Sequence, residues 1–376
     1  MITIVEVRTK KQQKLFIEFP LKLYKNNPYF VPPLYSEEKK LFKNNYCYYD
    51  ACKAAYFLAY KDGVLSGRIS AIIQTAANEK TGEKRVRFTR FDCFDDLSVS
   101  AALFKAVENY AVQNGMDTVC GPLGFSDLER EGLLVEGFEE LSTFEEQYNY
   151  PYYAKLIENA GFVKEKDWVE SKIYSPEDAR KKLRVKRAGE NVLKLYNLHF
   201  GKAKNINEFI KKYGDKFFEI LDKTYADIYG FAPFTENMKR ELIKNFKLIV
   251  SVKTVCVILD ESENPVCFGL CFPSIARAVQ KSGGRLTPAC LIRLLKAIKK
   301  PEIIDFGLIG VVPEYRNAGL TAAMLGFLYD IIESTRLKYG ETNLNLEDNL
   351  DVINQWKHFD SVRHKRRRAY VKKISE

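Results

Sequence analysis

The 376-residue sequence has no long hydrophobic run. No stretch approaches the roughly 18 uninterrupted apolar residues that a membrane-spanning helix needs, so we expect no membrane partner. Residues 1–8 mix acidic and basic side chains with apolar ones and lack the apolar centre of a signal peptide. We therefore expect a folded cytoplasmic protein, and the length predicts two domains of ordinary size.

Patterns that bind metals are also scarce. The chain has three histidines and eight cysteines, and no two cysteines have the CxxC spacing. Cys267 and Cys271 stand among aromatic and aliphatic residues that favour a β-strand. We expect reduced core cysteines and no metal cofactor.

The charge of the chain is unbalanced toward the basic side. Lys and Arg number 59 against 49 Asp and Glu, which gives a formal net charge of +10. This charge suits an anionic partner such as CoA, a nucleotide or tRNA, but does not choose among them. Much of the excess lies in residues 181–187 and 363–373, and such runs are commonly solvated faces.

Two halves of the sequence predict the same order of elements: hairpin, strand, helix, strand, helix, strand. In the first half, a turn at Asp62-Gly63 joins the hairpin strands, and Ser98 is the predicted cap of the first helix. The predicted strands of this half are residues 55–60, 66–73, 85–94, 118–120 and one beginning at 161, and its helices are residues 99–111 and 152–159.

The second half repeats the order and adds one amphipathic helix at residues 286–298, which either covers a cleft or packs on the sheet. A basic linker separates the halves, so we predict domains 1–178 and 190–376. The predicted strands of the second half are residues 254–259, 266–272, 303–312, 342–346 and one within 363–374, and its main helices are residues 320–332 and 349–359.

Residues 310–321 run from the end of a predicted strand into a strongly periodic helix. A loop that enters a helix presents unpaired backbone N–H groups and the positive end of the helix dipole, which both favour a pyrophosphate. Gly319 would let the backbone approach such a ligand closely. This segment therefore predicts an anion-binding site.

The same segment resembles the acyl-CoA loop of the GNAT superfamily, Arg/Gln-x-x-Gly-x-Gly/Ala. Arg316, Gly319 and Thr321 occupy its three key positions, with Thr321 in place of Gly or Ala. The resemblance implies an α/β (α+β) fold of two tandem GNAT-type acyl-CoA N-acyltransferase domains, each a mixed, mostly antiparallel sheet flanked by helices. The whole chain also resembles a bacterial family of tandem-GNAT, N-acetyltransferase-like proteins, notably at residues 30–34 and 121–122.

The resemblance implies that the second domain binds acetyl-CoA or another acyl-CoA. The main chain of Val311 and Val312 would pair with the pantetheine arm or the acyl carbonyl, as an added strand does. The implied cofactor-binding residues are Val311, Val312, Arg316, Asn317, Ala318, Gly319, Leu320, Thr321 and Asn349.

The acid–base residues are less well defined. Many GNAT enzymes donate a proton to the departing CoA thiolate from a Tyr that follows an Asn, but here Trp356 follows Asn349. An indole N–H is too weakly acidic for that role, so Trp356 is predicted to be core or cleft wall. Tyr315 is a candidate proton donor, and Glu341 and Glu347 are candidate bases toward an amine.

The loop of the first domain that corresponds to the CoA loop, residues 91–98, contains no glycine. Its Asp92, Asp95 and Asp96 would repel a pyrophosphate, so we expect this domain to have lost CoA binding. Its fold is expected to remain, with a role in shaping the acceptor site.

A glycine-punctuated insertion at residues 121–138 is too long for a plain connection. With the tyrosines that follow, it predicts a substrate groove at the domain interface, with Tyr148, Tyr152 and Gly121 as candidate substrate-binding residues. Alternatively, these tyrosines pack a core.

Three functions remain open. The first is acyl transfer from acyl-CoA to the amine of a small molecule or peptide. The second is a non-catalytic CoA- or ligand-binding protein, because the usual proton-donating Tyr is missing. The third is a Fem-like transferase that uses aminoacyl-tRNA and contacts phosphates through residues 363–368, although charges on an edge strand explain that run equally well.

Overall fold

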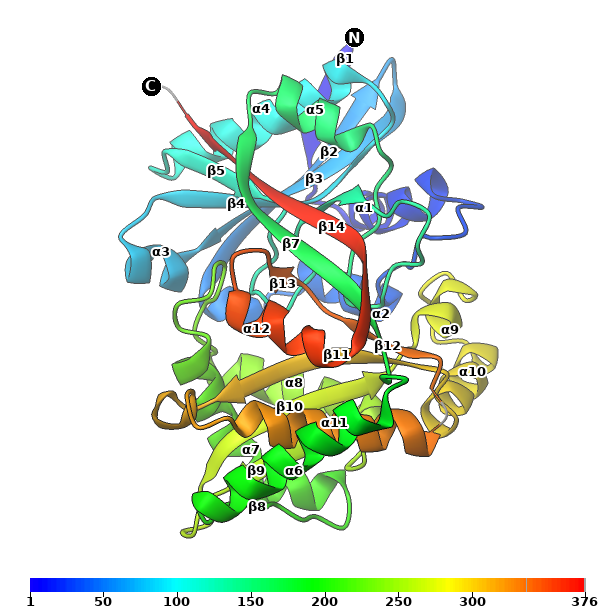
Figure 1. The fold of residues 1–376 in the computed structure, drawn as a ribbon. Helices are drawn as coiled ribbons and strands as arrows, with labels where there is room; N and C mark the ends of the chain where they lie inside the picture. Colours follow the sequence, from blue (N-terminus) through cyan, green and yellow to red (C-terminus); the bar gives the residue numbers. More distant parts are fainter. Residues whose placement is uncertain (336, 375–376) are drawn as a thin grey trace.

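The computed structural model describes residues 1–335 and 337–374. Their strands join into one continuous mixed sheet with helices on both faces (Figure 1). The strand order is β1-β2-β3-β4-β5-β14-β7-β12-β11-β10-β9-β8. Among the described residues, no helix is long and apolar enough to cross a membrane.

The first half of the chain builds the sheet from β1 to β5. The predicted hairpin is confirmed, since β2 and β3 meet at Asp62-Gly63, where both residues have positive φ (50° and 79°). The bounds are β1 (Ile2–Glu6), α1 (Lys10–Leu23), α2 (Tyr35–Glu38), β2 (Cys52–Lys61), β3 (Val64–Gln74), α3 (Thr75–Thr81), β4 (Arg85–Cys93), α4 (Leu97–Gln113), β5 (Thr118–Gly121), β6 (Leu133–Glu136) and α5 (Tyr153–Asn159).

The cap of α4 differs from the prediction. Asp96, and not Ser98, caps the helix, because its carboxylate accepts hydrogen bonds from the backbone N–H groups of Ser98 and Val99. The apolar stripe is as predicted, and Val99, Leu103 and Val107 are buried against the sheet.

The second half builds the other end of the sheet, from β12 to β8. The strand β10 is buried on both faces: Cys267 packs under α11 and Phe268 under α7. The bounds are α6 (Ala179–Leu195), β8 (His199–Phe200), α7 (Ile206–Thr224), α8 (Glu236–Ile249), β9 (Val255–Leu259), β10 (Pro265–Pro273), α9 (Ala276–Gln280), α10 (Pro288–Lys299), β11 (Ile303–Val311), α11 (Leu320–Thr335), β12 (Tyr339–Thr342), β13 (Asn345–Leu346) and α12 (Leu350–Gln355).

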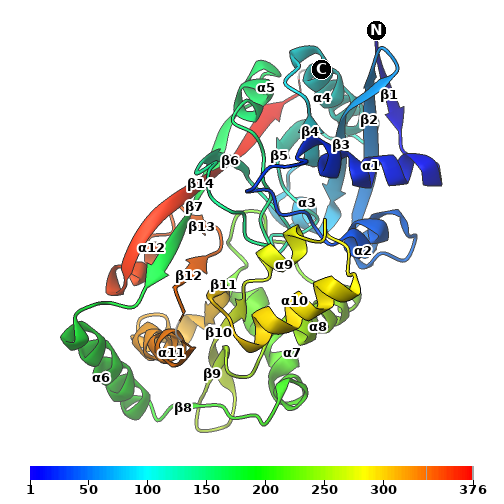
Figure 2. The same ribbon diagram turned by 90° about the vertical axis from the view of Figure 1, so that its right-hand side faces the viewer.

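Helices α8, α9 and α10 gather on one side of the second half, and α6 lies against α11 on the other side (Figure 2). Ile249 at the end of α8 and Leu294 of α10 belong to one apolar cluster with Ile275. The additional helix predicted at residues 286–298 is therefore present as α10, and it packs against helices rather than lying flat on the sheet.

Two long strands, β7 (Val163–Tyr174) and β14 (Asp360–Lys373), join the halves (Figure 1). They pair with each other, and each also pairs with the opposite half: β7 with β12, and β14 with β5. Each half therefore completes its sheet with the last strand of the other. The sequence did not predict this exchange, and the boundary between domains 1–178 and 190–376 stays a prediction.

Charged side chains are buried where these strands pair. Nζ of Lys365 lies 3.1 Å from Glu170 Oε2 and also donates a hydrogen bond to Glu341. Nε of Arg367 donates to Glu170 Oε1 at 2.5 Å. Because the side chains of Glu170, Lys365 and Arg367 are fully buried, this ion cluster fixes the register of β7, β12 and β14.

Replacing Lys365 by Met should destabilise the fold by about 3–5 kcal/mol, because it removes one partner of a buried ion cluster and leaves excess negative charge. Chemical denaturation would measure the free energy of unfolding. Lys338→Met is the matched control, since Lys338 pairs with Glu302 on the surface, and it should change that free energy little. Equal effects of the two substitutions would contradict the stabilising role of the cluster.

Candidate functional site

A cavity of about 1010 Å³ lies between the two halves. Its volume is at the upper end of the range of about 300–1,000 Å³ for small-molecule sites. The first half contributes residues 127–131 and 144–149 to the wall, and the second half contributes residues of α8, β10, β11, α11 and α12.

One wall of the cavity forms where β11 separates from β12. The two parallel strands pair from Ile303 and Tyr339 to Phe306 and Thr342, and β11 then continues without that partner. A β-bulge at Gly307 interrupts its pairing with β10 at the same point.

The main chain of Ile309 is hydrogen-bonded by a side chain in this open stretch. The hydroxyl of Tyr225 donates to Ile309 O at 3.0 Å and accepts from Ile309 N at 3.3 Å. Tyr225 follows α7 and lines the cavity, and burial raises the pKa of its hydroxyl. The hydroxyl of Tyr225 therefore lies beside the stretch of β11 that has no strand partner on the β12 side, where a bound ligand would form main-chain hydrogen bonds.

Most of the predicted cofactor-binding positions face the cavity. Gly319 has a φ of +79°, the left-handed conformation that favours glycine, and it begins the turn into α11. Val312, Ala318, Gly319 and Leu320 belong to the same loop, but they are not among the described lining residues. The loop residues that line the cavity are Val311, Arg316, Asn317 and Thr321, and Asn349 joins them from the N-terminus of α12.

Trp356 is buried in an apolar core cluster of the second half and also forms part of the cavity wall, so both predicted alternatives are confirmed. Its ring stacks on Phe306, with centroids 5.4 Å apart. Its Nε1 donates a hydrogen bond to Asn345 Oδ1 at 2.7 Å. The indole N–H is therefore engaged in holding β13 against α12.

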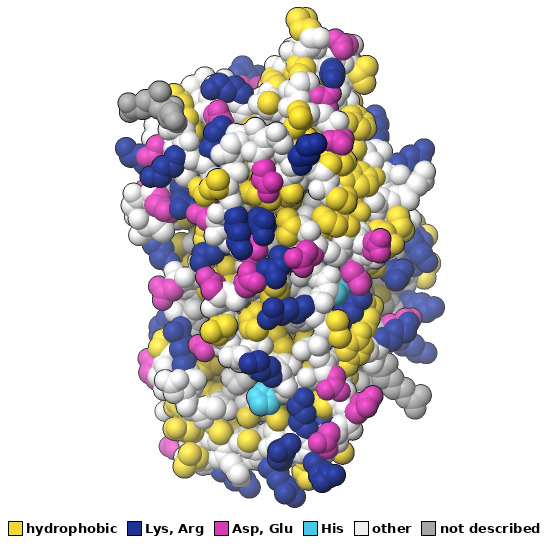
Figure 3. Space-filling view, turned by 45° about the horizontal axis from the view of Figure 1, so that its top comes forward, with side chains coloured by type: hydrophobic (Ala, Val, Ile, Leu, Met, Phe, Trp, Pro, Cys, Tyr) yellow, Lys and Arg dark blue, Asp and Glu magenta, His cyan; other side chains and the backbone are white. Residues whose placement is uncertain are grey.

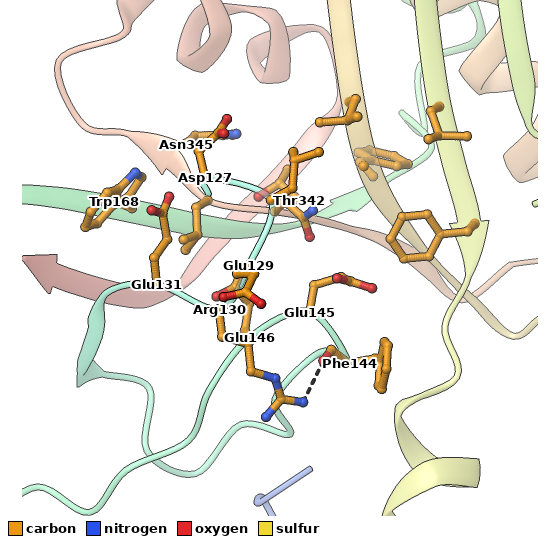
Figure 4. Close-up of a pocket in the computed structure, with 18 of the residues that line it drawn as sticks. Asp127, Glu129, Arg130, Glu131, Phe144, Glu145, Glu146, Trp168, Thr342 and Asn345 are labelled. Carbon is orange, nitrogen blue, oxygen red and sulfur yellow. Dashed lines mark hydrogen bonds between the residues drawn. The ribbon is translucent and has the colours of Figure 1, made fainter. Parts of the chain in front are cut away.

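A group of five carboxylates enters the cavity from the first half. Figure 4 shows Glu131, Glu145 and Glu146 on neighbouring loops of the first half, and all three line the cavity. Among the described residues, one oxygen of Glu131 and one of Glu146 are buried without a hydrogen-bond partner. This acidic group consists of Asp127, Glu129, Glu131, Glu145 and Glu146.

Burial raises the pKa of the acidic group, because ionised carboxylates lose solvation there. The pKa of both Asp127 and Glu145 rises to about 7, and the pKa of Glu131 rises well above its usual range. Arg130, which donates to the carbonyls of Val31 and Phe144, is the basic side chain of this loop. Buried acceptor oxygens of this kind suit the N–H donors of an amine.

Comparison with known proteins supports this architecture. No family model matches the sequence. The chain is 27% identical over 381 residues to Protein YghO of Escherichia coli, covering 97% of this chain and 94% of that one. It is 28% identical over 306 residues to the bacterial ceramide synthase of Caulobacter vibrioides, covering 79% of this chain and 77% of that one.

Solved structures match over the whole length of the chain. A tandem GNAT protein from the clavulanic acid biosynthesis pathway superposes with a TM-score of 0.55 at 10% identity, covering 100% of this chain and 99% of that one. A GNAT-related acetyltransferase from Anabaena variabilis superposes with a TM-score of 0.52 at 8% identity, covering 100% of this chain and 73% of that one. The chain has the tandem GNAT fold.

The two halves of this tandem GNAT fold differ at the start of one helix, α4 after β4 in the first half and α11 after β11 in the second. In the first half, Asp96 caps the N-terminus of α4 and also forms an ion pair with Lys61. Asp92 is buried, where Tyr24 and Arg68 donate hydrogen bonds to it. The loop before α4 therefore presents carboxylates, whereas the candidate CoA loop before α11 presents Asn317 and Thr321 to the cavity.

The predicted acid–base candidates of the GNAT site lie outside the described cavity wall. Although burial opposes ionisation, the ammonium of Lys365 and the ring of His364 lower the pKa of Glu341 to about 2. Glu347 accepts a hydrogen bond from Arg366 at 2.6 Å. Tyr315 packs edge-on against Tyr196.

Glu341 also belongs to a group with a possible metal-ligand arrangement. The ligand atoms of Glu170, Glu341 and His364 lie within 4.8 Å of one another. The ammonium group of Lys365 contacts both carboxylates, so the chain itself supplies a positive charge at this point.

Of the three predicted substrate-binding residues, Tyr148 lines the cavity, whereas Tyr152 and Gly121 are not among the described lining residues. Tyr148 lines the cavity, and its hydroxyl donates to Phe138 O at 3.3 Å. The hydroxyl of Tyr152 donates to Cys93 O within the first half, and Gly121 is in β5 opposite Tyr370. Neither Tyr152 nor Gly121 is among the described lining residues, so the groove prediction rests on Tyr148.

Within the basic run at residues 363–368, the side chains from His364 to Arg368 pair with carboxylates, and Arg363 is exposed. Arg368 binds Asp167 through two hydrogen bonds, and Arg366 binds Asp167 and Glu347. Figure 3 shows Lys and Arg side chains interspersed with Asp and Glu on this face, without a continuous basic surface. No observation here favours tRNA as the acyl donor.

Proposed function

We propose that the protein is an N-acyltransferase that transfers a long acyl chain from CoA to the primary amine of an amphiphilic acceptor. One observation carries the proposal: a single cavity brings the CoA-type loop, the open stretch of β11, the acidic group and an apolar recess together. Acetyl-CoA is the smaller donor that the GNAT fold alone would suggest.

The apolar recess favours a long acyl chain. Phe246 and Ile249 of α8 pack beside Leu270 and Phe272 of β10, and all four line the cavity. An acetyl group would leave this surface uncovered, whereas each buried CH₂ group of a longer chain contributes about 0.8 kcal/mol. The relative from Caulobacter is named a ceramide synthase, and ceramides are fatty amides of long-chain amino alcohols.

The acidic group favours an amine acceptor. An ammonium ion entering the cavity would pair with Glu131, one oxygen of which has no hydrogen-bond partner among the described residues, and with Glu146, whose Oε2 lies 3.6 Å from Nε of Arg367. The reaction needs the neutral amine, so a carboxylate close to the acyl group must take a proton before or during attack.

When bound, the thioester supplies the acyl group: the amine nitrogen forms a C–N bond with its carbonyl carbon, the C–S bond breaks, and CoA leaves. Counted from the ammonium form, nitrogen loses two protons: one passes to solvent before attack and one leaves during attack, while one proton must reach sulfur. We assign acceptance of the proton lost during attack to Asp127 and donation to sulfur to Tyr225, which both line the cavity. The charge of Asp127 raises the pKa of Tyr225 further. Tyr225 would thus act as the proton donor in place of the Tyr for which this chain has Trp356.

The proposal is tested by mass-spectrometric detection of amide product from palmitoyl-CoA and a long-chain amino alcohol. Asn317→Asp adds one negative charge to the CoA loop at nearly constant shape and should raise the KM for palmitoyl-CoA about tenfold. Asn207→Asp, on the exposed start of α7, is the matched control and should leave the KM unchanged. Binding of acyl-CoA without any amide would instead favour a non-catalytic protein.

The acid–base assignment predicts separate effects on turnover. Asp127→Asn and Tyr225→Phe should each lower kcat about 10²-fold without loss of acyl-CoA binding. Because Asp127 accepts a proton only when ionised and its pKa is about 7, kcat/KM of the native protein should rise as the pH increases through 7, and Asp127→Asn should lose that rise. Asp227→Asn, an exposed residue at the same cavity, is the control. An unchanged pH profile in Asp127→Asn would refute the assignment.

A further inference from the structure

An exposed apolar patch reaches the cavity at two of its residues, Leu248 and Leu286. Its side chains are between 46% and 70% exposed, which is unusual for such large apolar groups. Only Cys290 is fully buried among the residues of α10. The patch, called the apolar rim, consists of Leu248 of α8, Leu286 before α10, and Leu291, Ile292 and Leu295 of α10.

The two helices of the apolar rim form one surface. Ile249, next to Leu248, and Leu294 of α10 both pack against one apolar cluster around Ile275, so the end of α8 and α10 share that cluster. Exposed lysines flank the rim on both helices: Lys244 and Lys247 on α8, and Lys296 and Lys299 on α10.

The chemistry of this surface fits an anionic lipid bilayer. A helix with Leu and Ile on its outer face and Lys beside them is typical of helices that lie in the membrane interface. The apolar side chains would enter the acyl region, while the lysines would contact anionic headgroups.

The rim is continuous with the cavity. Leu248 and Leu286 are exposed to solvent and also line the cavity, and Phe246 and Ile249 lead from them toward β10. A long-chain amine could therefore pass from a bilayer into the apolar recess without crossing water.

We propose that the apolar rim docks the protein on an anionic lipid bilayer and admits the lipid amine acceptor from it. The route for the acceptor rests on the proposed function, whereas the docking does not. Contact with the surface needs no spanning helix, but it departs from our expectation that the protein has no membrane partner.

Co-sedimentation with vesicles tests the docking without turnover. The full chain should bind vesicles of phosphatidylcholine and phosphatidylglycerol in a 3:1 ratio, and bind pure phosphatidylcholine more weakly. Ile292→Gln/Leu295→Gln should lower the partition coefficient about tenfold. Leu195→Gln/Val112→Gln, which removes apolar side chains that are 76% and 60% exposed on other helices, should have no effect.

The outcomes separate docking from catalysis. If native protein and rim variant bind anionic vesicles equally, or if neither binds, the docking proposal is wrong whatever the activity. If the native protein binds no vesicles and the rim variant dissociates a dimer seen by sedimentation velocity, the rim is a self-association surface and the proposal is overturned. Vesicle binding lost in the rim variant, but with no amide formed by the native protein, would support docking and reject the proposed function.

Discussion

The buried contact of Lys365 with Glu170 and Glu341 holds the two halves of the molecule together. Its three partners lie on β14, β7 and β12, so one charge cluster sets the register of a strand pair that both halves share. Buried ions are costly to leave unpaired, so a shift of either strand would be strongly unfavourable. The sheet therefore behaves as one continuous element, and the two copies of the fold cannot separate without losing these contacts.

This constraint positions the cavity. Since β7 and β14 fix the first half relative to β11 and β12, residues 127–131 face the open stretch of β11. In the proposed function the first half contributes carboxylates to this cavity and needs no CoA loop of its own. The absence of glycine from residues 91–98 is compatible with that proposed role.

The sequence predicted the local elements well. Residues 310–321, the hairpin at Asp62-Gly63 and the apolar stripes of α4 and α11 have short-range patterns that depend on periodicity and turn chemistry. The strand exchange could not be predicted, because the partner of a sheet edge is chosen by contacts between residues about 200 positions apart. For the same reason, the basic run that includes Lys365 and Arg367 gave no sign that it is buried: its partner Glu170 lies 195 positions from Lys365.

The acidic group was missed although its residues stand in the insertion that was expected to be functional and in the segment that follows it. Glu131, Glu145 and Glu146 resemble surface acids in sequence, and only their place in the cavity, where Glu131 and Glu146 are buried, distinguishes them. The helices α7 and α8, for which we made no prediction, supply Tyr225 and the apolar recess. When a site forms between two halves of a chain, local sequence patterns therefore do not predict which residues meet in it.

We propose that both halves form one acyl-transfer cavity. Photolabelling with a palmitoyl-CoA analogue that carries diazirines both beside the carbonyl and near the chain end tests this proposal most directly. We expect adducts on residues 126–131 of the first half and on residues 242–249 of α8, with both lost in excess palmitoyl-CoA. Adducts confined to the second half would contradict a shared cavity.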